Sequence, residues 1–123
     1  MVVLDTNIII QYIKNDRRVV SWITRRILQQ ERFVISTITV IELLGYKYLQ
    51  EDERVAIERL LSDLHIIDLD VGIAKMAAVV RATYGVHVAD GAIIATALLL
   101  RLPLVTCDAK FKKVKGLGVI VPA

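Results

Sequence analysis

The amino-acid sequence predicts a three-layer α/β/α fold, in which helices cover both faces of a mostly parallel central sheet. Two observations predict this fold class. Short apolar runs alternate with longer segments whose apolar residues recur at helical spacing, and this alternation is typical of a parallel sheet. The chain is 55% apolar with a mean hydropathy of +0.55, which suits a fully covered sheet and some surface covered by a partner. Its 123 residues suit one domain, residues 1–123.

The first half of the chain is expected to contain two strands and four helices. The strands are apolar runs of three or four residues, whereas the helices have apolar residues every three or four positions. In chain order they are a buried strand at 1–4, a helix that begins at Asp5, a second helix at 19–30, a strand at 33–35, and two further helices at 39–49 and 52–62.

The second half is expected to begin with a strand and then two helices. In chain order its elements are a strand at 64–69, helices at 70–84 and 88–102, a strand at 104–106, a short turn at 109–113 and an edge strand at 119–121. Gly85 is expected to cap the first of these helices, because glycine readily adopts the left-handed conformation of a C-cap. The helix at 88–102 is the most apolar, so we expect it to be the most buried.

Several classes of protein are disfavoured by simple features of the sequence. The longest stretch without a charge, 91–100, is far shorter than the ~20 residues needed to span a bilayer. Asp5, Asn7 and Gln11 make the N-terminus unlike a signal peptide. The single cysteine, Cys107, excludes an internal disulfide and a cysteine zinc cluster. We therefore expect a cytoplasmic protein without a membrane segment.

Four acidic residues follow apolar runs or lie at helix starts, namely Asp5, Glu42, Asp90 and Asp108. In an open α/β sheet, the carboxyl ends of the strands and the helix starts beside them meet at one crevice. Carboxylates brought together there would repel one another unless a cation lay among them. Mg²⁺ and Mn²⁺ prefer oxygen ligands, so the four acids predict a site for a divalent metal.

Each acid also has a purely structural explanation. Asp5 and Asp108 could cap the helical segments that follow them. Thr39 and Glu42 match the spacing of a capping box, and Asp90 lies in a first helical turn, where the helix dipole favours negative charge. Taken singly, capping is the simpler explanation of each acid. Capping does not require acids at all four places, however, so the complete set favours the metal site.

Basic residues form two groups in a chain of net charge +3. One group is Lys110, Lys112, Lys113 and Lys115, and the other is Arg17, Arg18, Arg25 and Arg26. The lysines surround Asp108 in the sequence, and a basic surface beside an acidic pocket suits a polyanion such as a nucleic acid. The alternative is that both groups are merely solvated.

A few other side chains are candidates for minor roles. His87 precedes Asp90 and could contact a phosphate, whereas we expect His65 to be structural. Cys107 is expected to point away from the acids into packing. Trp22, Tyr46 and Tyr48 could stack on RNA bases, although aromatic residues in helices more often pack against the core or a dimer partner.

The acids lie in motifs that resemble those of the PIN domain, and specifically of the VapC family of toxin nucleases. In chain order the motifs are VVLDTNIII, the stretch 36–43 that contains Glu42, VADGAIIATAL and LVTCDAKF. The last resembles a Thr-x-Asp followed by Phe, here Thr106, Asp108 and Phe111. The third has Asp-Gly where the family usually has Asp-Ala. The resemblance covers nearly the whole chain, and all the motifs occur in order.

The resemblance implies an endoribonuclease that depends on Mg²⁺ or Mn²⁺. The four acids would be the metal ligands, and Thr6, Asn7 and Thr106 would orient them or contact a metal-bound water. Hydrolysis would then need no nucleophilic side chain, which agrees with the absence of a recognisable Ser-His or Cys-His arrangement. The resemblance also implies a homodimer and neutralisation by a small cognate antitoxin.

Two other functions remain open from the sequence. A catalytically inactive PIN-like module could dock RNA or protein, although it would tolerate the loss of some of the four acids. A phospho-receiver domain has a similar length, but it needs an acidic pair after the first strand, where this chain has only Asp5. Such a domain also needs a phospho-accepting Asp after the third strand and a lysine, to which Asp68 and Lys110 are weak matches. Glu42 and Asp90 would have no role in it.

Overall fold

The centre of the molecule is a sheet of five parallel strands in the order β3-β2-β1-β4-β5. The strands are β1 (Val2–Leu4), β2 (Phe33–Ser36), β3 (His65–Ile67), β4 (Leu104–Val105) and β5 (Val119–Ile120). This computed structural model describes all residues, 1–123. The predicted parallel sheet is confirmed, and β1 lies at its middle.

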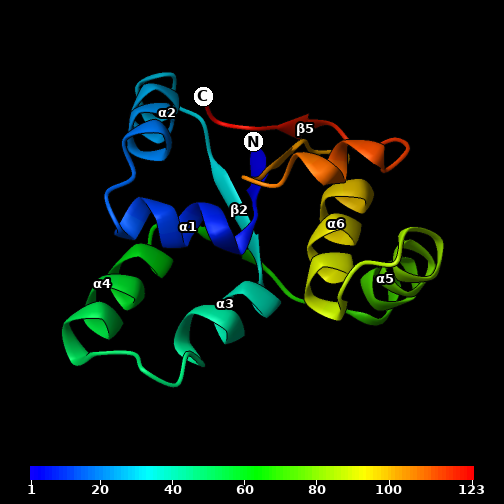
Figure 1. Ribbon diagram of the computed structural model, residues 1–123, viewed down its shortest axis with the longest axis horizontal. Coiled ribbons are helices and arrows are strands. Elements are labelled where there is room, and N and C mark those ends of the chain that lie inside the picture. The colour runs from blue at the N-terminus through cyan, green and yellow to red at the C-terminus, as the bar shows by residue number, and fades with distance from the viewer.

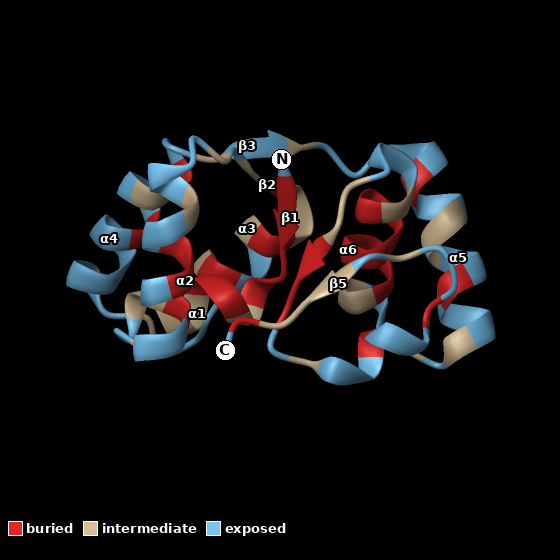
Figure 2. Cartoon of the chain, turned by 90° about the horizontal axis from the view of Figure 1, so that it is seen from above, coloured by how far each residue is buried: buried red, intermediate tan, exposed pale blue.

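Six α-helices surround the sheet (Figure 1). They are α1 (Thr6–Ile13), α2 (Arg17–Leu28), α3 (Thr37–Leu44), α4 (Glu51–Leu61), α5 (Val71–Tyr84) and α6 (Val88–Leu100), followed by a 3₁₀ helix at Ala109–Lys113. Figure 2 shows α1, α2 and α4 on one side of the strands and α5 and α6 on the other. The predicted three-layer α/β/α architecture is therefore confirmed.

The two faces of the sheet support two separate apolar cores. Val2 and Leu4 of β1 belong to the core that α1, α2, α3 and α4 complete, whereas Val3 belongs to the core formed with α5 and α6. This division follows from the strand itself, because successive side chains point to opposite faces. The middle of α6, from Gly91 to Ala97, is buried throughout, as expected from its apolar sequence.

The order of the strands creates a crevice at one edge of the sheet. The chain runs outward from β1 to β2 and β3, and then returns to the other side of β1 to form β4 and β5. Connections from β1 and β4 therefore leave in opposite directions. In open α/β sheets, ligands bind outside the carboxyl ends of the strands at such a switch point.

The elements occur in the predicted order, and the largest difference in bounds is at α3. It was expected at 39–49, but it spans Thr37–Leu44. Ser36 caps its start, since its hydroxyl accepts a hydrogen bond of 3.2 Å from the Ile38 N–H. Gly45 ends it, and a Cβ there would lie 2.5 Å from the Ile41 carbonyl oxygen. Gly85 has φ of 67° and ends α5, as predicted.

Membrane-spanning potential is limited to one bent pair of helices. No single helix is long and apolar enough to cross a bilayer, and α5 and α6 meet the length and composition criteria only together, with a bend of 116° between them.

Candidate active site

Asp5 is the most buried of the four acids, with 4% of its surface exposed. It follows β1 and caps α1, because its Oδ1 accepts a hydrogen bond of 2.8 Å from the Thr6 N–H. Its Oδ2 accepts a second bond, of 2.7 Å, from the Thr106 hydroxyl just after β4. Both carboxylate oxygens are thus held by groups at the switch point of the sheet.

The surroundings of Asp5 raise its pKa from 3.8 to about 6. Burial is the largest cause, because it disfavours the charged form. The hydrogen bond from Thr106 and that from the Thr6 N–H lower the pKa, while repulsion from Asp90 and from Glu42 raises it. The carboxylates of α6 and α3 therefore act on Asp5 across the crevice.

Glu42 reaches the crevice from α3. The Thr6 hydroxyl donates a hydrogen bond of 2.6 Å to Glu42 Oε1, although Glu42 itself is an exposed residue. The capping box that the sequence allowed between Thr39 and Glu42 is not formed, because Ser36 is the N-cap of α3. Thr39 is instead fully buried, and its hydroxyl lies 3.0 Å from that of Thr6.

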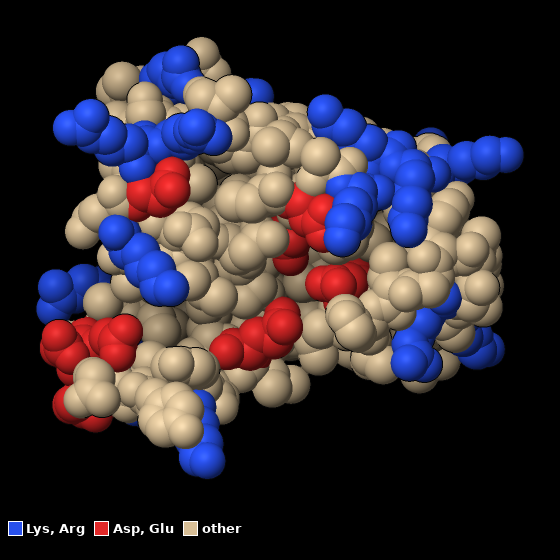
Figure 3. All heavy atoms as spheres, viewed as in Figure 1, with Lys and Arg blue, Asp and Glu red and all other residues tan.

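Asp90 lies in the first turn of α6 and is half-buried. Burial raises its pKa, repulsion from Glu42 and from Asp108 raises it further, and the neighbouring His87 lowers it. Together with the interactions of Asp5, these effects link all four predicted acids electrostatically. Figure 3 shows acidic side chains around the middle of this face, where α1, α3, α6 and the segment after β4 (orange in Figure 1) come together.

Asp108 and its neighbours form the fourth side of the crevice. Asp108 caps the 3₁₀ helix by accepting a bond of 2.9 Å from the Lys110 N–H, and its own N–H donates to the Thr106 hydroxyl over 3.0 Å. Asn7 Oδ1 accepts a bond of 3.2 Å from the Cys107 N–H, which ties the start of α1 to this loop. Thr106 therefore joins Asp5 to Asp108 through one hydroxyl group.

In a comparison with known proteins, a family model described as the PIN domain matches residues 2–117. The chain belongs to the PIN domain family. The predicted resemblance to VapC-type PIN-domain toxins is confirmed by solved structures. A comparison with curated proteins found no significant match.

Three solved structures illustrate the similarity. The first is a toxin–antitoxin complex from Klebsiella pneumoniae, at 28% identity and TM-score 0.80, with 100% of this PIN domain and 98% of that chain covered. DNA-bound VapBC from Salmonella typhimurium has 28% identity, TM-score 0.83 and 98% of each chain covered. FitAcB from Neisseria gonorrhoeae has 32% identity and TM-score 0.79, with 98% of this chain and 96% of that chain covered.

The donor groups of this PIN domain fit a hard divalent cation. Carboxylate and hydroxyl oxygens line the crevice, and burial, together with repulsion between the carboxylates, raises the pKa values of Asp5 and Asp90. No three His, Cys, Asp or Glu side chains are close enough to one another in this arrangement to enclose a metal ion. Because Mg²⁺ usually keeps several waters and binds only one or two carboxylates, such a set remains suitable for it.

The other candidate side chains from the sequence have different surroundings. His87 is the N-cap residue of α6 and is exposed. Cys107 was expected to pack inside, but it is exposed, because its turn leaves the sheet after β4. Tyr46 and Tyr48 follow the end of α3 rather than lying on a helix, and they are 59% and 63% exposed. Trp22 is buried in the core, with Arg26 4.7 Å above its ring.

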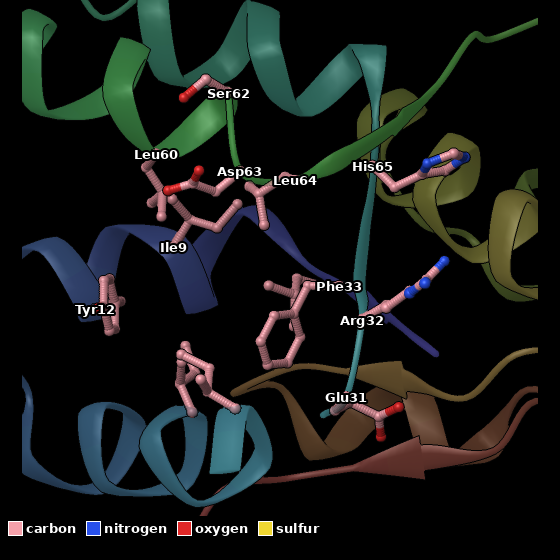
Figure 4. A pocket seen from close by; sticks show the side chains of 13 residues that line it. Ile9, Tyr12, Glu31, Arg32, Phe33, Leu60, Ser62, Asp63, Leu64 and His65 are labelled. Carbon is pink, nitrogen blue, oxygen red and sulfur yellow. The ribbon is translucent and has the colours of Figure 1, made fainter. Parts of the chain in front are cut away.

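A separate cavity of about 570 Å³ contains none of the four acids. It lies between α1, α2 and the end of α4, next to the beginnings of β2 and β3 (Figure 4). Its labelled lining includes Tyr12, Phe33 and Leu64, so it is largely apolar. This apolar cavity is therefore separate from the four carboxylates, which lie at the carboxyl edge of the sheet.

Proposed function

We propose that this PIN domain is a metal-dependent endoribonuclease that hydrolyses RNA phosphodiester bonds. The observation that carries the proposal is the electrostatic coupling of Asp5, Glu42, Asp90 and Asp108 at the switch point of the sheet. The chain has the fold of a family of nucleases. A bound cation would reduce the repulsion among the four acids, which favours metal binding at this place.

Mg²⁺ or Mn²⁺ is the proposed cofactor, with Asp5, Glu42, Asp90 and Asp108 as its candidate ligands, either directly or through coordinated water. When bound, a divalent metal lowers the pKa of a coordinated water and stabilises the leaving oxygen of the phosphodiester. Asp5 contributes a carboxylate that is already oriented by its bonds to Thr6 and Thr106. Thr6 orients Glu42, and Asn7 and Thr106 fix the loop that carries Asp108. These bonds hold the ligands in place before the substrate arrives, which favours catalysis.

The lysines that follow Asp108 suit the binding of the RNA backbone. Lys110, Lys112 and Lys113 belong to the 3₁₀ helix that Asp108 caps, and all three are exposed. Figure 3 shows basic side chains beside the acidic centre of this face. We propose that they contact phosphates on either side of the cleaved bond, while the acids act on that bond through the metal.

A protein antitoxin and a second copy of the chain are the proposed partners. The structures similar to this PIN domain are toxin–antitoxin and VapBC complexes, which supports a role as the toxin of such a pair. Large apolar side chains remain exposed in the single chain, among them Val71 at 70%, Ile41 at 65% and Val88 at 62%. Either partner would remove apolar surface of this kind from water.

Cleavage of a single-stranded RNA with Mg²⁺ or Mn²⁺ tests the enzyme proposal, with EDTA and Asp90→Asn as controls. We expect cleavage that is lost in both controls. Absence of cleavage together with intact Mn²⁺ binding by calorimetry would indicate a narrow substrate range. Absence of both cleavage and metal binding would overturn the four-carboxylate site and favour an inactive docking module instead.

A further inference from the structure

Thr39 is a buried polar residue that the proposed chemistry does not itself require. It is 0% exposed and lies in α3 three residues before Glu42. Residues three apart lie on the same side of a helix, so Thr39 and Glu42 both face the start of α1. The residue that they meet there is Thr6, whose hydroxyl oxygen is 3.0 Å from Thr39 Oγ1 and 2.6 Å from Glu42 Oε1.

Counting protons fixes the direction of this chain of hydrogen bonds. The Thr6 hydroxyl has one proton, and an ionised carboxylate can only accept, so the Thr6 proton goes to Glu42. The Thr6 oxygen then accepts the proton of the Thr39 hydroxyl. Because each bond in such a chain polarises the next, Thr39 makes Thr6 a better donor to Glu42.

Thr39 differs in its hydrogen bonding from the threonines that lie beyond the first turn of a helix. Thr24, Thr83 and Thr96 each donate to the carbonyl oxygen four residues earlier, over 2.7 to 2.8 Å. A local bond of that kind is the usual choice of a helical threonine. Thr39 is the third residue of α3, so the carbonyl four residues earlier belongs to Ile35 of β2, and the side-chain partner of Thr39 is Thr6 of α1.

We propose that Thr39 is a positioning residue, whose buried hydroxyl fixes the Thr6 side chain and thereby holds the Glu42 carboxylate over the crevice. The inference rests on the proposed function for its consequence, metal binding. Glu42 is exposed, and nothing else recorded in the structure holds its carboxylate, since its only side-chain hydrogen bond comes from Thr6. Without Thr39, Thr6 can rotate and Glu42 loses its fixed direction.

The test compares Thr39→Val with Thr39→Ser and with the control Thr96→Val. Valine keeps the shape of threonine without its hydroxyl, and serine keeps the hydroxyl. Thr96 is also 0% exposed, but its hydroxyl bonds to the Ala92 carbonyl instead of the site. Two quantities are measured in each protein: the three-bond NMR couplings to the Thr6 methyl carbon, which report its rotamer, and the affinity for Mn²⁺ by calorimetry.

We expect one Thr6 rotamer in the wild type, in Thr39→Ser and in Thr96→Val, and averaged couplings in Thr39→Val. We expect Mn²⁺ affinity to fall about tenfold in Thr39→Val, the low end of the effect usual for a group behind a metal ligand, and to recover in Thr39→Ser. Wild-type couplings in Thr39→Val would overturn the proposal, as would averaged couplings with unchanged Mn²⁺ affinity. If the wild type itself bound no Mn²⁺ and cut no RNA, the enzyme proposal would fail, while the couplings would still decide the role of Thr39.

Discussion

Asp5 and Thr106 lie 101 positions apart in the chain and are joined by a hydrogen bond of 2.7 Å across the β1–β4 pair. The Thr106 hydroxyl donates to Asp5 and accepts from the Asp108 N–H, so one side chain connects two of the four acids. Burial nevertheless raises the pKa of Asp5 to about 6, which means that these bonds do not offset the loss of hydration. The metal-free site is therefore a local source of instability at neutral pH.

The first prediction concerns the stability of the metal-free protein between pH 4 and 7. The pKa of Asp5 is about 6 in the folded protein and near 3.8 when the chain is unfolded, so the folded state binds the proton more tightly. Proton binding by Asp5 therefore adds to the free energy of unfolding. This stabilisation is fully present below pH 3.8 and is lost as the pH rises through about 6. The difference between the two pKa values corresponds to about 3 kcal/mol. Urea unfolding in EDTA at a series of pH values measures it.

Comparison with Asp5→Asn isolates this contribution from that of other acids. The free energy of unfolding of Asp5→Asn should fall less between pH 4 and 7 than that of the wild type. Asp70→Asn is the matched control, because Asp70 caps α5 by a similar bond of 2.8 Å to the Ile73 N–H. Equal pH dependence of the wild type and Asp5→Asn would show that the Asp5 pKa is not raised.

The second prediction separates catalysis from helix capping at Asp5 and Asp90. Either residue changed to asparagine should abolish RNA cleavage, because a neutral amide is a much poorer metal ligand than a carboxylate. The folded structure should persist, and metal-free Asp5→Asn should be more stable than the wild type at pH 7.5, by about 1 to 3 kcal/mol. Circular dichroism and urea unfolding provide the check. Because asparagine caps a helix as well as aspartate does, full cleavage by these variants would contradict the role of Asp5 and Asp90 as metal ligands and leave capping as their role.

The positions of Asp5 and Asp108 were predictable because each follows a recognisable apolar run. Asp5 and Asp108 follow strands β1 and β4, and parallel strands bring their carboxyl ends to one edge. The bond from Thr106 to Asp5 could not be predicted in the same way, because it depends on β4 pairing with β1. That pairing is made between segments about a hundred residues apart and is fixed by the packing of both cores.

The place of Thr39 was not predicted, because the expected start of α3 at residue 39 is two residues later than its observed start at Thr37. A helix starting after Thr39 would make that residue a cap, with Glu42 folded back onto the backbone. Capping by Ser36 instead puts Thr39 inside the helix, on the same side as Glu42. The available signal was Ser36 itself, a good N-cap residue directly after an apolar strand.

The third prediction is that the isolated protein is a dimer. One chain has a mass of 13.8 kDa, so light scattering after size exclusion should give close to twice that value. The physical reason is the set of large apolar side chains that a single chain leaves in water, which includes Leu28 at 79% exposed and Val71 at 70%. A mass of 13.8 kDa at micromolar concentration would contradict the proposal of a homodimer.

The fourth prediction assigns RNA binding to the lysines of the 3₁₀ helix. Lys112→Ala combined with Lys113→Ala should weaken binding of single-stranded RNA, because each lysine that neutralises a phosphate releases counterions. For two contacts, the slope of log affinity against log salt should become shallower by about 1.4. Fluorescence anisotropy at several salt concentrations measures the slope, with EDTA present so that no RNA is cut.

The control for this experiment removes the same charge from a different part of the surface. Arg59→Ala combined with Lys75→Ala changes exposed residues on α4 and α5, and the net charge falls by the same amount. If the overall charge of the protein attracted RNA, both double variants would bind more weakly with the same change in slope. If Lys112 and Lys113 contact phosphates directly, the slope should change only in their variant. An unchanged slope in that variant would mean that the lysines beside Asp108 face solvent and that the RNA approaches the acids from another direction.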